Sequence, residues 1–284
     1  MNRGPAAPPL LRTPSARIVL YLFLFIVLQI LISALVFVSG SIDILILPAA
    51  SVIPFTLLMW RFIDRRPIGE LGARWERHEG RRLMAGIFIG GLFVSLLFLG
   101  GIAIGAGALL GWQEGPLPAA LGELATVLVI LFIAAAAEEI AFRGYILQNL
   151  RQGGDRWTAI LVSSAIFSAI HFMNPHYFKS FAPINIFLIG MVFALIRIRW
   201  NSLWLPIGLH FGWNFTLGPI LSLPVSGLEM FTGLLRVRWP GEELLWTGGQ
   251  FGPEGGLLCT LFLALALILL SLPGAASPRP ILVE

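Results

Sequence analysis

Long apolar runs dominate the chain, separated by short stretches rich in Arg, Gly and Pro. Eight of them are long enough to cross about 30 Å of hydrocarbon; they lie at roughly 17–39, 43–62, 83–111, 118–150, 156–174, 183–199, 201–221 and 256–273. The run at 118–150 exceeds one span, so part of it should tilt or project into water. The pattern predicts an all-α, polytopic membrane protein of about eight transmembrane helices.

Basic residues test this count independently. With the N-terminus in the cytoplasm, 16 of the 19 Lys and Arg residues fall on the cytoplasmic side, against Lys179, Arg236 and Arg238 outside. The bias predicts cytoplasmic tails at 1–16 and 275–284, and a single transmembrane domain at 17–274 between them. The charged segment 63–82 should lie along the cytoplasmic headgroups. Without organelle signals, we expect a prokaryotic cytoplasmic membrane.

Composition agrees with this class of protein. The 284 residues are 57% hydrophobic and 12% charged, more apolar than a soluble core of this length requires. A net charge of +4 could suggest nucleic acid, but the arginines between apolar runs are better explained by membrane topology, so we expect a lipid bilayer and no nucleic acid as partners. The single cysteine, Cys259, excludes a disulfide framework or a four-thiolate metal site.

Two glutamates and an arginine interrupt the fourth apolar run. An ionisable residue inside a span costs a few kcal/mol, so it calls for a partner or a task. Glu139 and Arg143 lie four apart with the acid first, the favourable order for an ion pair on one helix face. Glu138 points about 100° away around the helix and has no local partner, which makes it the better candidate for a general base. The preceding run Ala134–Ala137 offers a smooth surface to a helix or a peptide.

Two more apolar runs carry histidines. His171 lies in the fifth run, and His210 and Asn214 lie four apart in the seventh, where both can donate hydrogen bonds to one oxygen. Gly208 and Gly212 form a smooth stripe on that same seventh helix.

Helix rise provides a check on depth. At 1.5 Å per residue, Glu138 and Asn214 lie about 20 Å from the cytoplasmic edge, His171 about 22 Å and His210 about 14 Å. The sequence therefore predicts one polar site in the membrane interior.

At these positions the sequence resembles the type II CAAX-processing endopeptidases and bacteriocin-processing membrane proteases. The family's first motif, two glutamates followed by an arginine, appears as Glu138, Glu139 and Arg143. Its second appears as Phe167 with His171, and its third as His210 with Asn214. Order and spacing agree over about residues 118–220, which we take as the catalytic core.

The resemblance implies a glutamate-dependent intramembrane endopeptidase. Glu138, helped by His171, would activate a water, while His210 and Asn214 would stabilise the oxyanion. Glu139, Arg143 and Phe167 would support the site. The substrate would then be a membrane-associated or lipidated peptide or protein, and prenylated tails, bacteriocin leaders and membrane-protein segments all stay open.

A metal-dependent mechanism is the first alternative. Glu138, His171 and His210 could supply three zinc ligands. The chain lacks the His-Glu-x-x-His helix that would place two ligands and a base together, so we expect no cofactor.

Two other function classes stay open. Buried carboxylates and histidines also serve proton-coupled transporters. A non-catalytic scaffold could keep the same fold. The sequence shows no inverted repeat that would favour a transporter, and a scaffold has no need of six polar residues in its spans.

Overall fold

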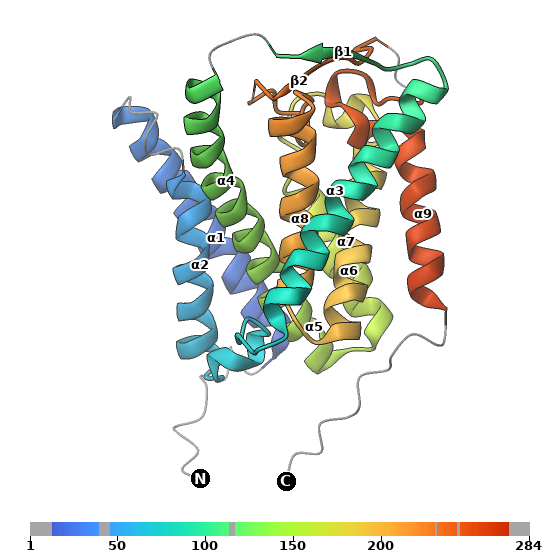
Figure 1. Cartoon of the computed structure of the whole chain (residues 1–284). Helices are drawn as coiled ribbons and strands as arrows, with labels where there is room; N and C mark the ends of the chain where they lie inside the picture. Colours follow the sequence, from blue (N-terminus) through green and yellow to red (C-terminus); the bar gives the residue numbers. More distant parts are fainter. Residues whose placement is uncertain (1–12, 40–45, 114–116, 231, 243–244, 273–284) are drawn as a thin grey trace.

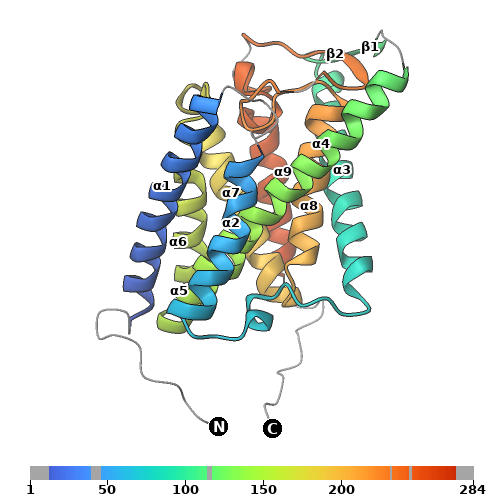
Figure 2. The ribbon, with the colours of Figure 1, turned by 90° about the vertical axis from the view of Figure 1, so that its left-hand side faces the viewer.

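The apolar runs form helices that pack side by side, as the hydrophobic pattern predicts (Figures 1 and 2). The computed structural model describes residues 13–39, 46–113, 117–230, 232–242 and 245–272. The predicted tail 275–284, and all but the end of the tail 1–16, lie outside the described residues. The α-helices are α1 (Pro14–Ser39), α2 (Leu47–Leu58), α3 (Glu79–Ala103), α4 (Leu117–Glu139), α5 (Leu147–Gly153), α6 (Arg156–Ala169), α7 (Ala182–Trp200), α8 (Trp204–Phe215) and α9 (Leu257–Ser271).

Shorter elements complete the bundle. Among the described residues, three π-helical turns extend or join the helices, at Met59–Ile63 after α2, Ile140–Ile146 between α4 and α5, and Thr216–Ile220 after α8. Four 3-10 turns lie at Ile68–Leu71, Tyr177–Lys179, Gly249–Phe251 and Pro253–Gly255. The antiparallel strands β1 (Ala108–Trp112) and β2 (Leu235–Arg238) lie across one end, which we call the sheet end. The opposite end carries the segment 61–82 and is called the Arg-rich end.

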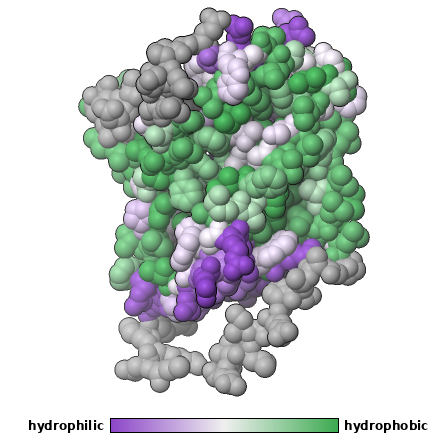
Figure 3. All heavy atoms as spheres, viewed as in Figure 1, coloured by the Kyte–Doolittle hydropathy of each residue, from purple (hydrophilic) through white to green (hydrophobic). Residues whose placement is uncertain are grey.

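Four of the described helices are long and apolar enough to cross a membrane: Pro14–Val38, Glu79–Ala103, Leu124–Gly153 and Ala182–Trp200. The helices at Leu47–Ile63 and Leu257–Ser271 are apolar but shorter. Hydrophobic side chains form a band around the middle of the visible face, and hydrophilic ones gather mainly at the Arg-rich end (Figure 3). The chain is therefore an integral membrane protein, and the count of eight spans stays a prediction.

Two predicted helix boundaries are wrong, and the all-α prediction misses a small sheet. The run 83–111 leaves its helix at Ala103, because the chain turns through Gly105 (φ +77°) and then enters β1. The partner strand β2 lies in a loop far along the sequence, which a local pattern does not reveal. The run 156–174 leaves its helix at Ala169, so His171 lies in a turn after α6. Pro175 disfavours helical backbone at the residue before it, which helps to end the run early.

Glycines let α3 and α8 cross closely, as the small-residue stripe predicts. A Cβ atom at Gly208 or Gly212 would collide with backbone carbonyl oxygens of α3. Gly86 and Gly90 of α3 face carbonyl oxygens of α8 in the same way. This crossing holds the helix that carries His210 against α3.

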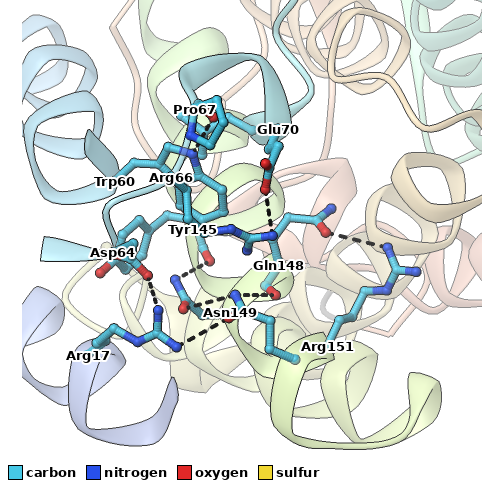
Figure 4. A network of polar contacts seen from close by, with 12 residues as sticks. Arg17, Trp60, Asp64, Arg66, Pro67, Glu70, Tyr145, Gln148, Asn149 and Arg151 are labelled. Carbon is cyan, nitrogen blue, oxygen red and sulfur yellow. Dashed lines mark hydrogen bonds and ion pairs between the residues drawn. The ribbon is translucent and has the colours of Figure 1, made fainter. Parts of the chain in front are cut away.

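A polar network ties α1 to α5 at the Arg-rich end (Figure 4). The Arg17 guanidinium donates to Asp64 Oδ1 at 2.9 Å and to Gln152 Oε1 at 3.2 Å. The Asp64 side chain is fully buried, so Arg17 is the cation that balances it. Tyr145 lies in the same network, and its ring stacks on Tyr21 of α1 at 4.2 Å between centroids.

Replacing Arg17 by methionine is expected to destabilise the protein by about 3 kcal/mol, because the buried Asp64 carboxylate loses its partner. The measurement is the unfolding midpoint in detergent. Arg61→Met, at an exposed position nearby, serves as the matched control and should leave the midpoint unchanged. Equal midpoints for both variants would contradict the assigned role of Arg17.

Candidate active site

Glu139, Arg143 and His210 form a buried ionic cluster at the centre of the site. Arg143 donates from Nη1 to Glu139 Oε1 at 2.9 Å, and both side chains are almost completely buried. The His210 Nδ1–H donates to the same Glu139 oxygen at 3.0 Å. The predicted ion pair between residues 139 and 143 is present, and it also holds a histidine from α8.

Aromatic rings and a π-helical turn hold Arg143 in place. The turn Ile140–Ile146 begins directly after Glu139, and Arg143 lies in its middle. The Arg143 guanidinium lies over the rings of Phe167 at 4.1 Å and Phe193 at 5.0 Å, and its Nη2 donates to Gly190 O at 3.3 Å. Such cation–π contacts stabilise a charge that burial has separated from water. π-helical turns are rare and are often found at functional sites.

Glu138 lies beside this cluster in a different environment. Its Oε2 atom is 3.9 Å from His210 Nε2, and its side chain is one-third exposed. That oxygen is buried and has no hydrogen-bond partner among the described residues. Glu138 also faces a cavity between α1, α2 and α4, lined mainly by apolar residues that include Phe25, Val52, Ala134 and Ala137. Glu139 Oε2 also has no hydrogen-bond partner among the described residues, so the two glutamates differ in another way. Glu139 is fully buried and its Oε1 accepts from Arg143 and His210, whereas Glu138 is one-third exposed and faces the cavity.

His171 and Asn214 line a small pocket together with His210. The His171 ring donates from Nδ1 to Phe167 O at 2.8 Å, which leaves Nε2 as an acceptor in the neutral ring. Among the described contacts, Glu138 pairs with His210 and not with His171. The structure thus gathers all seven predicted site residues in one region, with His210 as the histidine nearest to Glu138.

Sequence reasoning missed Glu254, which lines the same pocket. Glu254 is buried and lies in the 3-10 turn before α9. Its Oε1 accepts from the Trp213 Nε1–H at 2.9 Å, and its Oε2 accepts from the Ser226 backbone N–H. The turn-rich run 247–256 signals a shaped turn in the sequence, and Glu254 is the one ionisable residue in it. Nothing local indicates that this turn folds back onto the site.

In the part of the chain that the structure describes, no three His, Cys, Asp or Glu side chains converge as metal ligands would. Glu138, His171 and His210 are therefore not placed as a three-ligand set. Metal-free chemistry stays a prediction.

Comparison with known proteins identifies the same segment of the chain. Residues 120–216 match the family model described as type II CAAX prenyl endopeptidase Rce1-like. An Escherichia coli protein described as an uncharacterized 24.3 kDa protein is 33% identical over 87 residues. That alignment covers 30% of this chain and 39% of the E. coli protein, so it spans well under half of either.

The matched segment contains all seven residues of the three motifs, from Glu138 to Asn214. The resemblance that these motifs predict is confirmed over residues 120–216, the segment that matches the Rce1-like type II CAAX prenyl endopeptidase family model.

Proposed function

We propose that the protein is an intramembrane endopeptidase in which Glu138 activates a water for attack on a peptide bond. The observation that carries the proposal is the contrast between the two glutamates. Glu139 is fully buried and its Oε1 accepts hydrogen bonds from Arg143 and His210, whereas Glu138 is one-third exposed and faces a cavity. Each glutamate has an Oε2 without a hydrogen-bond partner among the described residues, but only Glu138 has one next to open space. The family match over residues 120–216 supports a protease of the CAAX type.

Water activation uses Glu138 and His171. A carboxylate with a free oxygen can accept a proton from a water bound beside it. The hydrogen bond from His171 Nδ1 to Phe167 O leaves Nε2 able to accept from the same water and to orient it. The Phe167 ring packs on His171 at 4.9 Å between centroids, which limits rotation of the imidazole.

Oxyanion stabilisation uses His210 and Asn214. With carboxylates at both ring nitrogens, His210 can carry a proton on each nitrogen and donate from Nε2 to the developing oxyanion. The Asn214 amide lines the same pocket and supplies a second donor. Attack transfers one water proton to Glu138. When the C–N bond breaks, Glu138 returns that proton to the leaving amine, so the products are a carboxylic acid and an amine.

The cavity beside Glu138 supports a substrate that arrives from the lipid side. Its walls come from α1, α2 and α4, and the small side chains of Ala134, Ala137 and Ala141 keep it open next to the carboxylate. An extended peptide bound along these alanines would bring a backbone carbonyl to Glu138. The substrate is thus proposed to be a membrane-associated peptide or protein, with or without a lipid.

Asn214→Ala is expected to lower kcat about 100-fold with little change in KM, because the donor acts on the transition state more than on bound substrate. The assay is cleavage of a peptide library by the purified protein in detergent, with thermal unfolding as the check on folding. Unchanged kcat in a folded variant would remove Asn214 from the mechanism.

A further inference from the structure

The buried Glu254 carboxylate joins two walls of the candidate pocket. On one side it accepts from Trp213, the residue directly before Asn214 on α8. On the other side it accepts from the backbone N–H of Ser226. Both carboxylate oxygens are therefore occupied by N–H donors, an arrangement that the ionised carboxylate satisfies fully.

A short chain of hydrogen bonds continues from Ser226 to His171. The Asn174 side-chain amide donates to Ser226 O at 2.9 Å, and the Asn174 backbone N–H donates to His171 O at 2.9 Å. Ser226 has a left-handed backbone (φ +50°), which a non-glycine residue adopts only where its surroundings hold it. The Ser226 peptide thus connects Glu254 to the turn that carries His171.

The turn that carries Glu254 is itself anchored from the bundle. The buried Asn185 of α7 donates to the backbone oxygens of Glu254 at 2.7 Å and Gly256 at 2.9 Å. The Thr260 hydroxyl of α9 donates to the side-chain Oδ1 of Asn185 at 2.7 Å. The backbone of Glu254 is therefore held in place by hydrogen bonds from the bundle. Its side chain in turn binds both walls of the pocket, so the positions of the two walls depend on it.

We propose that Glu254 is a positioning residue of the hydrolytic site, whose ionised carboxylate holds the His171 turn and the Asn214 segment of α8 in register across the pocket. The inference rests on the proposed function and adds a residue that sets the positions of His171 and Asn214 in that same site. Glu254 does not take part in the proton transfers assigned to Glu138.

The hydrogen bonds that join Glu254 to Trp213 and Ser226, here called the Glu254 link, weaken as the pH falls. Burial raises the pKa of Glu254 to about 7, against the opposing effects of the hydrogen bonds from Ser226 and Trp213 and of nearby His210. The other titratable groups that act on it or share its pocket are Glu138, His171 and Cys259, and α7 presents the neutral Asn185. Below this pKa one oxygen carries a proton and can no longer accept from its N–H donor. Acidification therefore loosens the link, and a rise in pH restores it.

Glu254→Gln tests the proposal. The glutamine amide has one acceptor oxygen, so its NH2 group faces one of the two N–H donors and loses that hydrogen bond at every pH. At pH 8.5 the variant should show a kcat about tenfold below wild type, the size expected when a hydrogen bond to a buried charge is lost. At pH 5.5, where wild-type Glu254 is protonated, the two kcat values should converge. Glu229→Gln, at an exposed glutamate three residues after Ser226, is the matched control and should follow wild type at both pH values. A ratio that stays constant with pH would show a merely structural role and overturn the proposal.

Trp213→Phe provides a second test if the glutamine variant does not fold. It removes one donor to the carboxylate and keeps a ring against Phe93, so the acidic limb of the kcat profile should move to higher pH. An unmoved limb would contradict the role of the carboxylate.

A measurement without substrate separates this inference from the proposed function. At pH 8, amide hydrogen exchange over residues 171–176 should be faster in Glu254→Gln than in wild type. Faster exchange in a protein that cuts no peptide would support the link and sink the peptidase proposal. Unchanged exchange in a protein that cleaves would do the reverse.

Discussion

Glu138→Gln is expected to reduce peptide cleavage about 1,000-fold with KM nearly unchanged, since the amide cannot accept the proton of the attacking water. Folding should be affected little, because the Glu138 side chain is one-third exposed and its Oε2 has no hydrogen-bond partner among the described residues. The measurement is single-turnover cleavage by purified protein in lipid nanodiscs, with thermal unfolding in parallel.

The neighbouring Glu139→Gln is the matched contrast on the same helix. Glu139 accepts from both Arg143 and His210, so its loss should lower the unfolding midpoint as well as the activity. Cleavage that persists undiminished in Glu138→Gln would exclude this residue as the base. Proton flux into liposomes that is lost in Glu138→Gln, with no peptide ever cut, would favour the transporter class instead.

Arg143→Met is expected to have the largest effect on stability, a loss of about 3–5 kcal/mol in the free energy of unfolding. The substitution leaves the buried Glu139 carboxylate without its arginine partner and removes the guanidinium from the Phe167 and Phe193 rings. Arg143→Lys should recover only part of this loss, because an ammonium group lacks the planar surface that packs between two rings. The unfolding midpoint in detergent measures both variants.

Arg151→Met is the matched control for this prediction, since Arg151 is an exposed residue on the helix α5 that continues from the same π-helical turn. The control should unfold close to wild type. An Arg143→Met protein as stable as the control would show that Arg143 does not balance the buried carboxylate.

Much of the candidate site was predictable from the sequence because local spacing decides it. Four-residue separation brings Glu139 to Arg143 and places His210 and Asn214 on one side of α8. The different surroundings of the two glutamates follow from their 100° offset around one helix. The glycine stripe of α8 likewise predicted a close helix crossing, and α3 meets it with glycines of its own.

Other features depend on which distant segments come into contact, and a local sequence pattern does not contain that information. His171 lies outside its predicted helix because the chain turns before Pro175, and β1 pairs with a strand in a distant loop. The sequence pattern predicts a continuous helix around Arg143, whereas the structure has a π-helical turn there, with Phe167 and Phe193 packed on the guanidinium.

The sequence by itself determined the membrane class, the helical bundle and the motif residues, because hydrophobic runs and fixed helical spacing are properties of short segments. Only the tertiary structure decided that Glu138 lies beside His210, and that Glu254 reaches the pocket of His171, His210 and Asn214 from the turn before α9. Those pairings arise from helices far apart in the chain, whose packing sets which polar side chains share one buried space.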